Sequence, residues 1–63
     1  MQTHEVDLKA RNFSAREAAA YLRFSESFIW KLIRRGALKA TRVGRRTIIT
    51  GSAIAELLEQ NAA

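Results

Sequence analysis

The hydrophobic period of this sequence changes at Gly36, and the change restricts the folds that its central part can adopt. Before the glycine, apolar residues between Ile29 and Ile33 recur at the three- and four-residue spacing of an amphipathic helix. After it, the β-prone runs Ala40–Val43 and Arg46–Ile49 flank a turn that begins at Gly44. Glycine at the first turn position suits a type II′ hairpin. The central part therefore predicts one helix followed by a two-stranded hairpin.

Capping residues predict where three helices begin and end. Ser14 is followed three residues later by Glu17, the spacing of a capping box at a helix N-terminus. Gly36 can adopt the left-handed conformation that ends a helix. The predicted helices, each with the serine that caps it, are Ala15–Leu22 after Ser14, Glu26–Arg35 after Ser25 and Ala53–Gln60 after Ser52.

The same periods predict which side chains face the core. On each helix the apolar residues gather on one face, and polar or charged residues occupy the opposite face. The predicted core residues of the helices are Ala18, Ala19 and Leu22, then Ile29, Leu32 and Ile33, and last Ile54, Leu57 and Leu58. Alternation in the hairpin predicts one set of Arg42, Arg46 and Ile48 and a second set of Thr41, Val43, Thr47 and Ile49.

Together these elements predict a mainly α-helical fold with a small β-hairpin, the arrangement of a winged helix-turn-helix. Two strands alone are marginally stable in water, so the hairpin must lie against the helices. Residues 1–12 show neither period and predict a flexible N-terminal arm, and residues 61–63 predict a frayed C-terminus. The predicted winged domain covers residues 13–60 between them.

Positive charge is concentrated in the same central part of the chain. Seven of the eleven Lys and Arg residues lie between Lys31 and Arg46, and no Asp or Glu occurs between Ser27 and Ala55. The rest of the chain carries six acidic and four basic residues, so the net charge of +5 comes from a local patch. Such a patch on a small domain indicates nucleic acid first and an anionic membrane surface second.

Several classes of function have no support in the sequence. With no Cys and the single His4, the chain lacks a set of residues for disulfides or for a metal site. No nucleophile and base occur together, and the three glycines are too dispersed to cradle a phosphate, so we expect no enzyme activity, cofactor or small-molecule ligand. No segment has a signal-peptide pattern or the length of a membrane span, so we expect a cytoplasmic protein.

Two other binding functions are weaker alternatives to duplex DNA. A membrane-surface or protein-interaction module would need a broad exposed apolar helix face, but the core requires the apolar faces of these helices. RNA binding fits the charge, but the predicted strands lack the aromatic residues on which bases stack.

Residues in every predicted element follow a pattern shared by one family. They are Glu17, Ala19 and Leu22, then Ser25, Ile29, Leu32, Ile33 and Gly36, then Leu38, Val43, Gly44, Arg45 and Arg46, and finally Ile49, Ile54 and Leu58. Through them, the segment from Phe13 to Leu58 resembles the excisionase-type, MerR-like winged-helix DNA-binding domains. The chain departs from the pattern at Arg23, a turn position that is often glycine, and at Phe28 and Thr47.

This resemblance implies that the second helix enters the major groove, while the hairpin, or wing, contacts the adjacent minor groove or the backbone. Arg offers paired donors to guanine or phosphate, Lys supplies a phosphate-binding charge, and Ser can bond a phosphate or a base edge. Arginines on a thin wing also suit the narrow minor groove. The predicted DNA-binding residues are Ser27, Trp30, Lys31, Arg34 and Arg35 in the helix and Arg42, Arg45 and Arg46 in the wing.

The resemblance also implies a biological role. Excisionases are recombination directionality factors that bind attachment-site DNA cooperatively, bend it and steer a site-specific integrase toward excision. We therefore expect a sequence-specific, double-stranded DNA-binding excisionase of a phage or mobile element. Its expected partners are DNA, an integrase and further copies of itself along the DNA. The alternative is a small MerR-like transcriptional regulator, a class that usually adds an effector or dimerisation segment to this domain.

Overall fold

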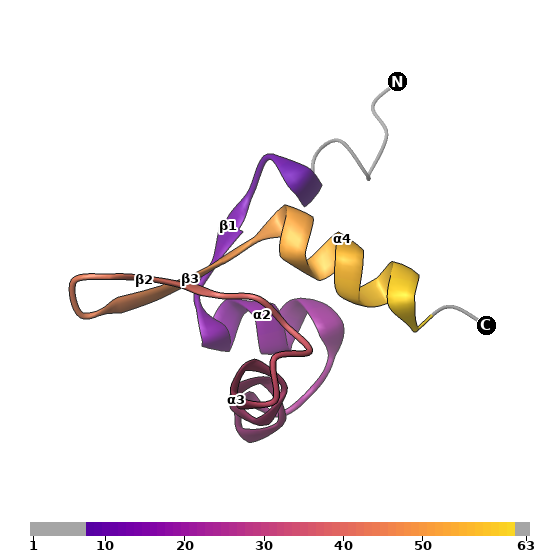
Figure 1. Ribbon diagram of the computed structural model, residues 1–63, viewed down its shortest axis with the longest axis horizontal. Coiled ribbons are helices and arrows are strands. Elements are labelled where there is room, and N and C mark those ends of the chain that lie inside the picture. The colour runs from indigo at the N-terminus through magenta and orange to yellow at the C-terminus, as the bar shows by residue number, and fades with distance from the viewer. Residues whose placement is uncertain (1–7, 62–63) are drawn as a thin grey trace.

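The computed structural model describes residues 8–61 as three helices and a three-stranded antiparallel sheet. In Figure 1 the hairpin projects to the left, away from the helices. The fold is mainly helical with a small hairpin, which confirms the predicted winged helix-turn-helix. In chain order the elements are β1 (Asn12–Phe13), α2 (Ala15–Leu22), α3 (Glu26–Arg34), β2 (Thr41–Val43), β3 (Arg46–Thr50) and α4 (Gly51–Gln60).

The first two long helices begin where their capping residues predict. At α2 the capping box is complete, because Ser14 N donates to Glu17 Oε1 at 2.9 Å and Glu17 N donates to Ser14 Oγ at 3.0 Å. At α3, Phe28 N donates to Ser25 Oγ at 3.1 Å. These bonds satisfy backbone N–H groups that a helix start otherwise leaves without partners, and they fix both boundaries locally.

The turns that end these helices use left-handed residues. Arg23 closes α2 with φ 63° and ψ 37°, a conformation that is costly for a residue with a Cβ atom. Gly36 adopts φ 79° after α3, as the sequence predicts. The helix itself stops at Arg34, one residue earlier than predicted, and Arg35 is its C-cap.

The start of α4 differs from the prediction. Thr50, and not Ser52, is the N-cap, because Ala53 N donates to Thr50 Oγ1 at 3.1 Å. Strand β3 runs directly into α4 at Gly51, so no loop separates the two elements. The extended backbone of the last strand residue is also the backbone that an N-cap requires.

Strand β3 lies at the centre of the sheet, between β1 and β2. The two-residue β1 pairs Asn12 with Thr50 and Phe13 with Ile49, a pairing that the sequence did not predict. The chain before it is also packed, since Leu8 is only 7% exposed. Residues 8–12 therefore belong to the folded domain, in contrast to the predicted arm over 1–12. The remaining residues of that arm, 1–7, lie outside the described residues.

Of the predicted frayed C-terminus, residues 61–63, the structure describes only Asn61. Asn61 caps α4, and its Nδ2 donates to the carbonyl oxygen of Leu57 at 2.8 Å. It is therefore held by the helix that it follows. The other two residues of the predicted frayed end, 62–63, lie outside the described residues.

The register of the hairpin corrects the predicted sets of wing residues. The turn has two residues and closes with Val43 opposite Arg46, and Gly44 adopts φ 61°. Residues that are directly opposite in an antiparallel ladder project from the same face. One face therefore carries Arg42, Thr47 and Ile49, and the other carries Thr41, Val43, Arg46 and Ile48. The prediction that Arg42 and Arg46 share a face is wrong.

The core lies where α2, α3 and α4 meet the sheet. Its four largest fully buried side chains are Ile29, Leu38, Ile49 and Ile54. Ala18 is also fully buried, and a side chain this small on α2 lets α3 approach closely. The prediction is wrong for Leu58, which is 47% exposed.

Candidate nucleic-acid interface

The outer face of α3 is the first part of the candidate interface. Ser27, Lys31 and Arg34 are all exposed, and their spacing of four and three residues places them on one side of the helix. On the opposite side, Ile29 is fully buried. The buried face fixes the rotation of α3 about its axis. The polar side chains on the opposite face therefore project into solvent and make no contact with the core.

Trp30 lies at the edge of this face. The indole is half-buried and packs against the core, while its Nε1 donates to Glu26 Oε2 at 3.4 Å, a long hydrogen bond within one helical turn. Part of the ring is therefore structural, and the edge that remains exposed borders the basic surface.

The last turn of α3 adds further positive charge. Lys31 and Arg34 lie in this turn, and the exposed Arg35 is the C-cap. Cations interact favourably with the helix C-terminus, so this placement stabilises α3 as well as extending the basic surface.

The wing carries three exposed arginines in different positions. Arg45 lies in the turn, Arg42 projects from one face of the ladder and Arg46 from the other. The face of Arg42 is the one that continues to the fully buried Ile49. The wing therefore presents positive charge on both faces and at its end, which suits a thin element inserted beside two phosphate backbones.

A cleft of about 240 Å³ lies between the wing and the helices α2 and α3. Its lining includes Trp30 from α3, Arg45 and Arg46 from the wing, and Arg16 from the first turn of α2. Arg16 is the one of these four that sequence reasoning missed. The sequence signal was its place two residues after a helix cap, but its proximity to the wing depends on the tertiary fold.

Within residues 8–61, most of the basic patch has no carboxylate partner. The ion pair found there joins Lys39 Nζ to Glu56 Oε1 at 3.6 Å, between side chains that are 76% and 48% exposed. Away from the patch, the guanidinium of Arg11 lies 4.8 Å from the ring centroid of Phe13. The predicted DNA-binding side chains are thus available to an anionic ligand, and their contact with DNA stays a prediction.

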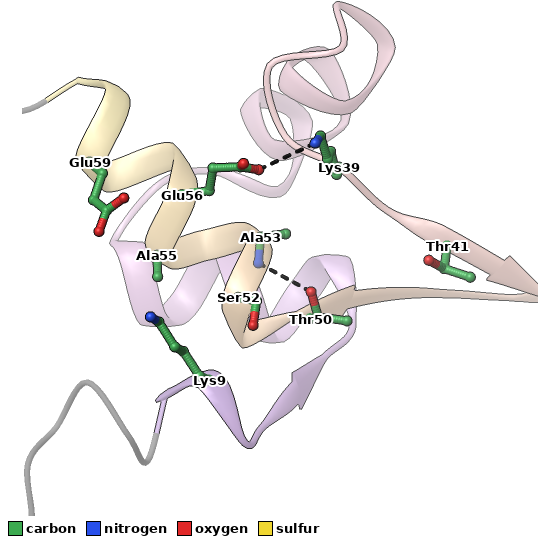
Figure 2. A pocket seen from close by; sticks show the side chains of 9 residues that line it. All are labelled: Lys9, Lys39, Thr41, Thr50, Ser52, Ala53, Ala55, Glu56 and Glu59. Atoms are coloured by element: carbon green, nitrogen blue, oxygen red, sulfur yellow. Dashed lines mark hydrogen bonds and ion pairs between the residues drawn. The ribbon is translucent and has the colours of Figure 1, made fainter.

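A second cavity lies away from the candidate interface. It has a volume of about 430 Å³ and lies beside the start of α4, where Lys9, Lys39 and the two glutamates of that helix line it (Figure 2). The Lys39–Glu56 pair and the Thr50 cap line it. Charges of both signs make it a poor site for a polyanion.

Residues 8–61 hold no group of three His, Cys, Asp or Glu side chains that could bind a metal ion. None of the helices in that range is long and apolar enough to cross a membrane.

Comparison with known families decides the class of the domain. A model of a helix-turn-helix domain matches residues 13–62. The chain belongs to this helix-turn-helix family. The family includes excisionase-like DNA-binding proteins, and it supports binding to double-stranded DNA. Neither a curated protein nor a solved structure matched the chain. The helix-turn-helix consists of α2, the turn at Arg23 and α3.

Proposed function

We propose that this helix-turn-helix protein is an excisionase that binds attachment-site DNA, bends it and steers an integrase toward excision. The observation that carries the proposal is the surface formed by the outer face of α3 and the arginines of the wing. Among the described residues, no Lys or Arg side chain of this surface forms an ion pair, and the domain belongs to a family that includes excisionase-like proteins.

In this proposal α3 lies in the major groove. Arg34 has a planar guanidinium that can donate two hydrogen bonds to one guanine, while Ser27 and Lys31 reach a base edge or a phosphate. Arg35 and the exposed edge of Trp30 border the backbone at the same groove. The base contacts of α3 supply the sequence preference, because phosphate contacts alone carry no sequence information.

The wing supplies the second set of contacts. Arg45 lies in the turn and enters the minor groove, whose narrow form has an enhanced negative potential. Arg42 and Arg46 project from opposite faces, so they can reach the two phosphate backbones that border this groove. Contacts in two grooves on one side of the duplex favour a bend toward the protein, and further copies bound next to the first would extend that bend.

The binding part of the proposal is tested by a gel-shift titration over a range of salt concentrations. About four to eight phosphate contacts predict that log affinity falls with log salt at a slope of about −4 to −7. A control duplex without the attachment sequence should bind more weakly with a similar slope. Binding that does not respond to salt, or the absence of binding to any duplex, would contradict the proposal.

The excision part needs its own assay. Attachment-site DNA and the integrase of the same element are incubated with and without the protein, and the excised product is quantified. An excisionase increases excision strongly. If excision does not change while a neighbouring promoter responds, the protein is the alternative, a small MerR-like transcriptional regulator using the same DNA surface.

A further inference from the structure

The cleft between α2, α3 and the wing brings together three arginines that are far apart in the sequence. Arg16 lies in the first turn of α2, and Arg45 and Arg46 lie at the turn of the hairpin, yet all three line the same cleft of about 240 Å³. Such clustering of like charges is unfavourable unless an anion compensates for it. In the sequence, the whole of α3 lies between the helix that carries Arg16 and the hairpin that carries the other two arginines.

We propose that this cleft binds one phosphate of the DNA backbone and that Arg16 is a DNA-binding residue of this protein. The inference rests on the proposed function, because the phosphate belongs to the duplex that α3 and the wing hold. Guanidinium groups from two sides match the several oxygens of one phosphate, which can accept paired hydrogen bonds from each arginine.

One carboxylate, that of Glu26, also lines the cleft, and its Oε2 accepts the hydrogen bond from Trp30 Nε1. Its single negative charge stands against three arginines, so the charged residues of the lining still sum to +2. Glu17 is one residue after Arg16, and its Oε1 accepts from Ser14 N in the capping box. Within residues 8–61 no ion pair closer than 4.0 Å involves Arg16, Arg45 or Arg46. The arginines, and not the helix N-terminus, therefore supply the attraction, because Glu17 already occupies that terminus.

A phosphate held in this cleft would also position the wing. Arg16 is fixed to α2, which packs against α3, whereas Arg45 and Arg46 belong to a hairpin that projects from the domain (Figure 1). One anion bound by both sides connects the wing to the helix-turn-helix across the cleft. The orientation of the wing relative to α3 is then set by the DNA itself.

The test compares Arg16→Ala with Arg23→Gly, a control that removes one positive charge from the other end of α2. Both positions are exposed, and each replacement suits its local backbone, so circular dichroism should show that both variants fold. Each protein is titrated by gel shift against duplexes that carry a single neutral methylphosphonate, moved one phosphate at a time along the site.

For Arg16→Ala we expect an affinity about three- to tenfold below wild type and a salt slope that is smaller by about one. One methylphosphonate position should weaken wild type and Arg23→Gly by a similar factor and weaken Arg16→Ala by a smaller factor, because only the contacts from Arg45 and Arg46 remain at that phosphate. If Arg16→Ala behaves like Arg23→Gly at every position, the inference is wrong and the proposed function stands. If wild type binds no duplex, the proposed function fails, and the inference fails with it.

Discussion

Gly51 is the position where the smallest change should have the largest effect on stability. The residue is buried at the start of α4, under the backbone of the chain that leads into β1. A Cβ atom there would overlap the carbonyl oxygen of Leu8 and come within 2.5 Å of its carbonyl carbon and 3.1 Å of Lys9 Cα. Backbone atoms cannot rotate away as a side chain can. Gly51→Ala must therefore displace the segment from Leu8 onward.

The cost follows from what this segment contributes. Leu8 is 7% exposed, and returning such a side chain to water costs about 1.5–3 kcal/mol. Gly51 N donates to the carbonyl oxygen of Arg11 at 2.8 Å, and losing this bond costs about 1 kcal/mol. Alanine is favoured over glycine in a helix by about 1 kcal/mol, which offsets the lost bond. The expected net destabilisation is about 1.5–3 kcal/mol, a large part of the stability of so small a domain.

Urea unfolding followed by circular dichroism measures this difference. Gly44→Ala is the matched control, because no atom lies within 4 Å of a Cβ placed there and only the cost of φ 61° remains, about 1 kcal/mol. Leu8→Ala tests the mechanism. If Gly51→Ala acts by displacing Leu8, the double variant should be less destabilised than the sum of the single variants. A Gly51→Ala protein as stable as wild type, or strict additivity with Leu8→Ala, would refute this reasoning.

Three further predictions concern caps and DNA contacts. Arg23→Gly should stabilise the domain by about 0.5–1 kcal/mol in the same unfolding assay, because glycine adopts the left-handed conformation without strain. Thr50→Ala should cost about 1 kcal/mol, and Ser52→Ala should cost much less, since the hydroxyl of Thr50 is the one that caps α4. In gel shifts against site variants, Arg34→Ala should lose about 1–3 kcal/mol and relax the preference at one base pair. Arg45→Ala should weaken all duplexes by a similar factor, and equal behaviour of the two variants would contradict their separate roles.

The parts of the fold that could be predicted depend on residues close together in the sequence. The cap of α2 involves two residues three positions apart, Ser14 and Glu17, and the left-handed turn after α3 needs only Gly36. Each of these signals acts within one helical turn, so the sequence contains the complete interaction. The boundaries that they predict agree with the structure to within one residue at α2 and α3.

The errors concern interactions between distant segments. Strand β1 has two residues and no alternating pattern, and it exists because it pairs with β3 some 36 residues later, as in the partners Phe13 and Ile49. Both Thr50 and Ser52 are residue types that can cap a helix, and the direct continuation of β3 into α4 selects Thr50. Leu58 follows the helical period of the core, but no element of the described chain covers it. The pairing of β1, the cap of α4 and the exposure of Leu58 all depend on the tertiary fold, so no local sequence pattern predicts them.

The candidate interface divides in the same way. The period of α3 predicts that Ser27, Lys31 and Arg34 face away from the core, and the structure places all three in solvent. In the wing, by contrast, the relative faces of the arginines depend on which residues close the turn. The cleft that contains Arg16 depends on where the hairpin lies relative to α2, which no local pattern encodes.

Strand β3 explains how a chain without disulfides can hold a charged wing in a defined place. Its first residue, Arg46, belongs to the wing and lines the cleft, while Ile49 is fully buried and pairs with Phe13. Its last residue, Thr50, caps α4. The strand is thus held by a neighbour on each side and by the helix that follows it. Since Gly51 rests against the backbone of Leu8, the N-terminal segment supports the strand that carries the wing, although it is remote from the basic surface. Stability and the placement of the wing arginines that we predict to bind DNA therefore depend on the same few residues.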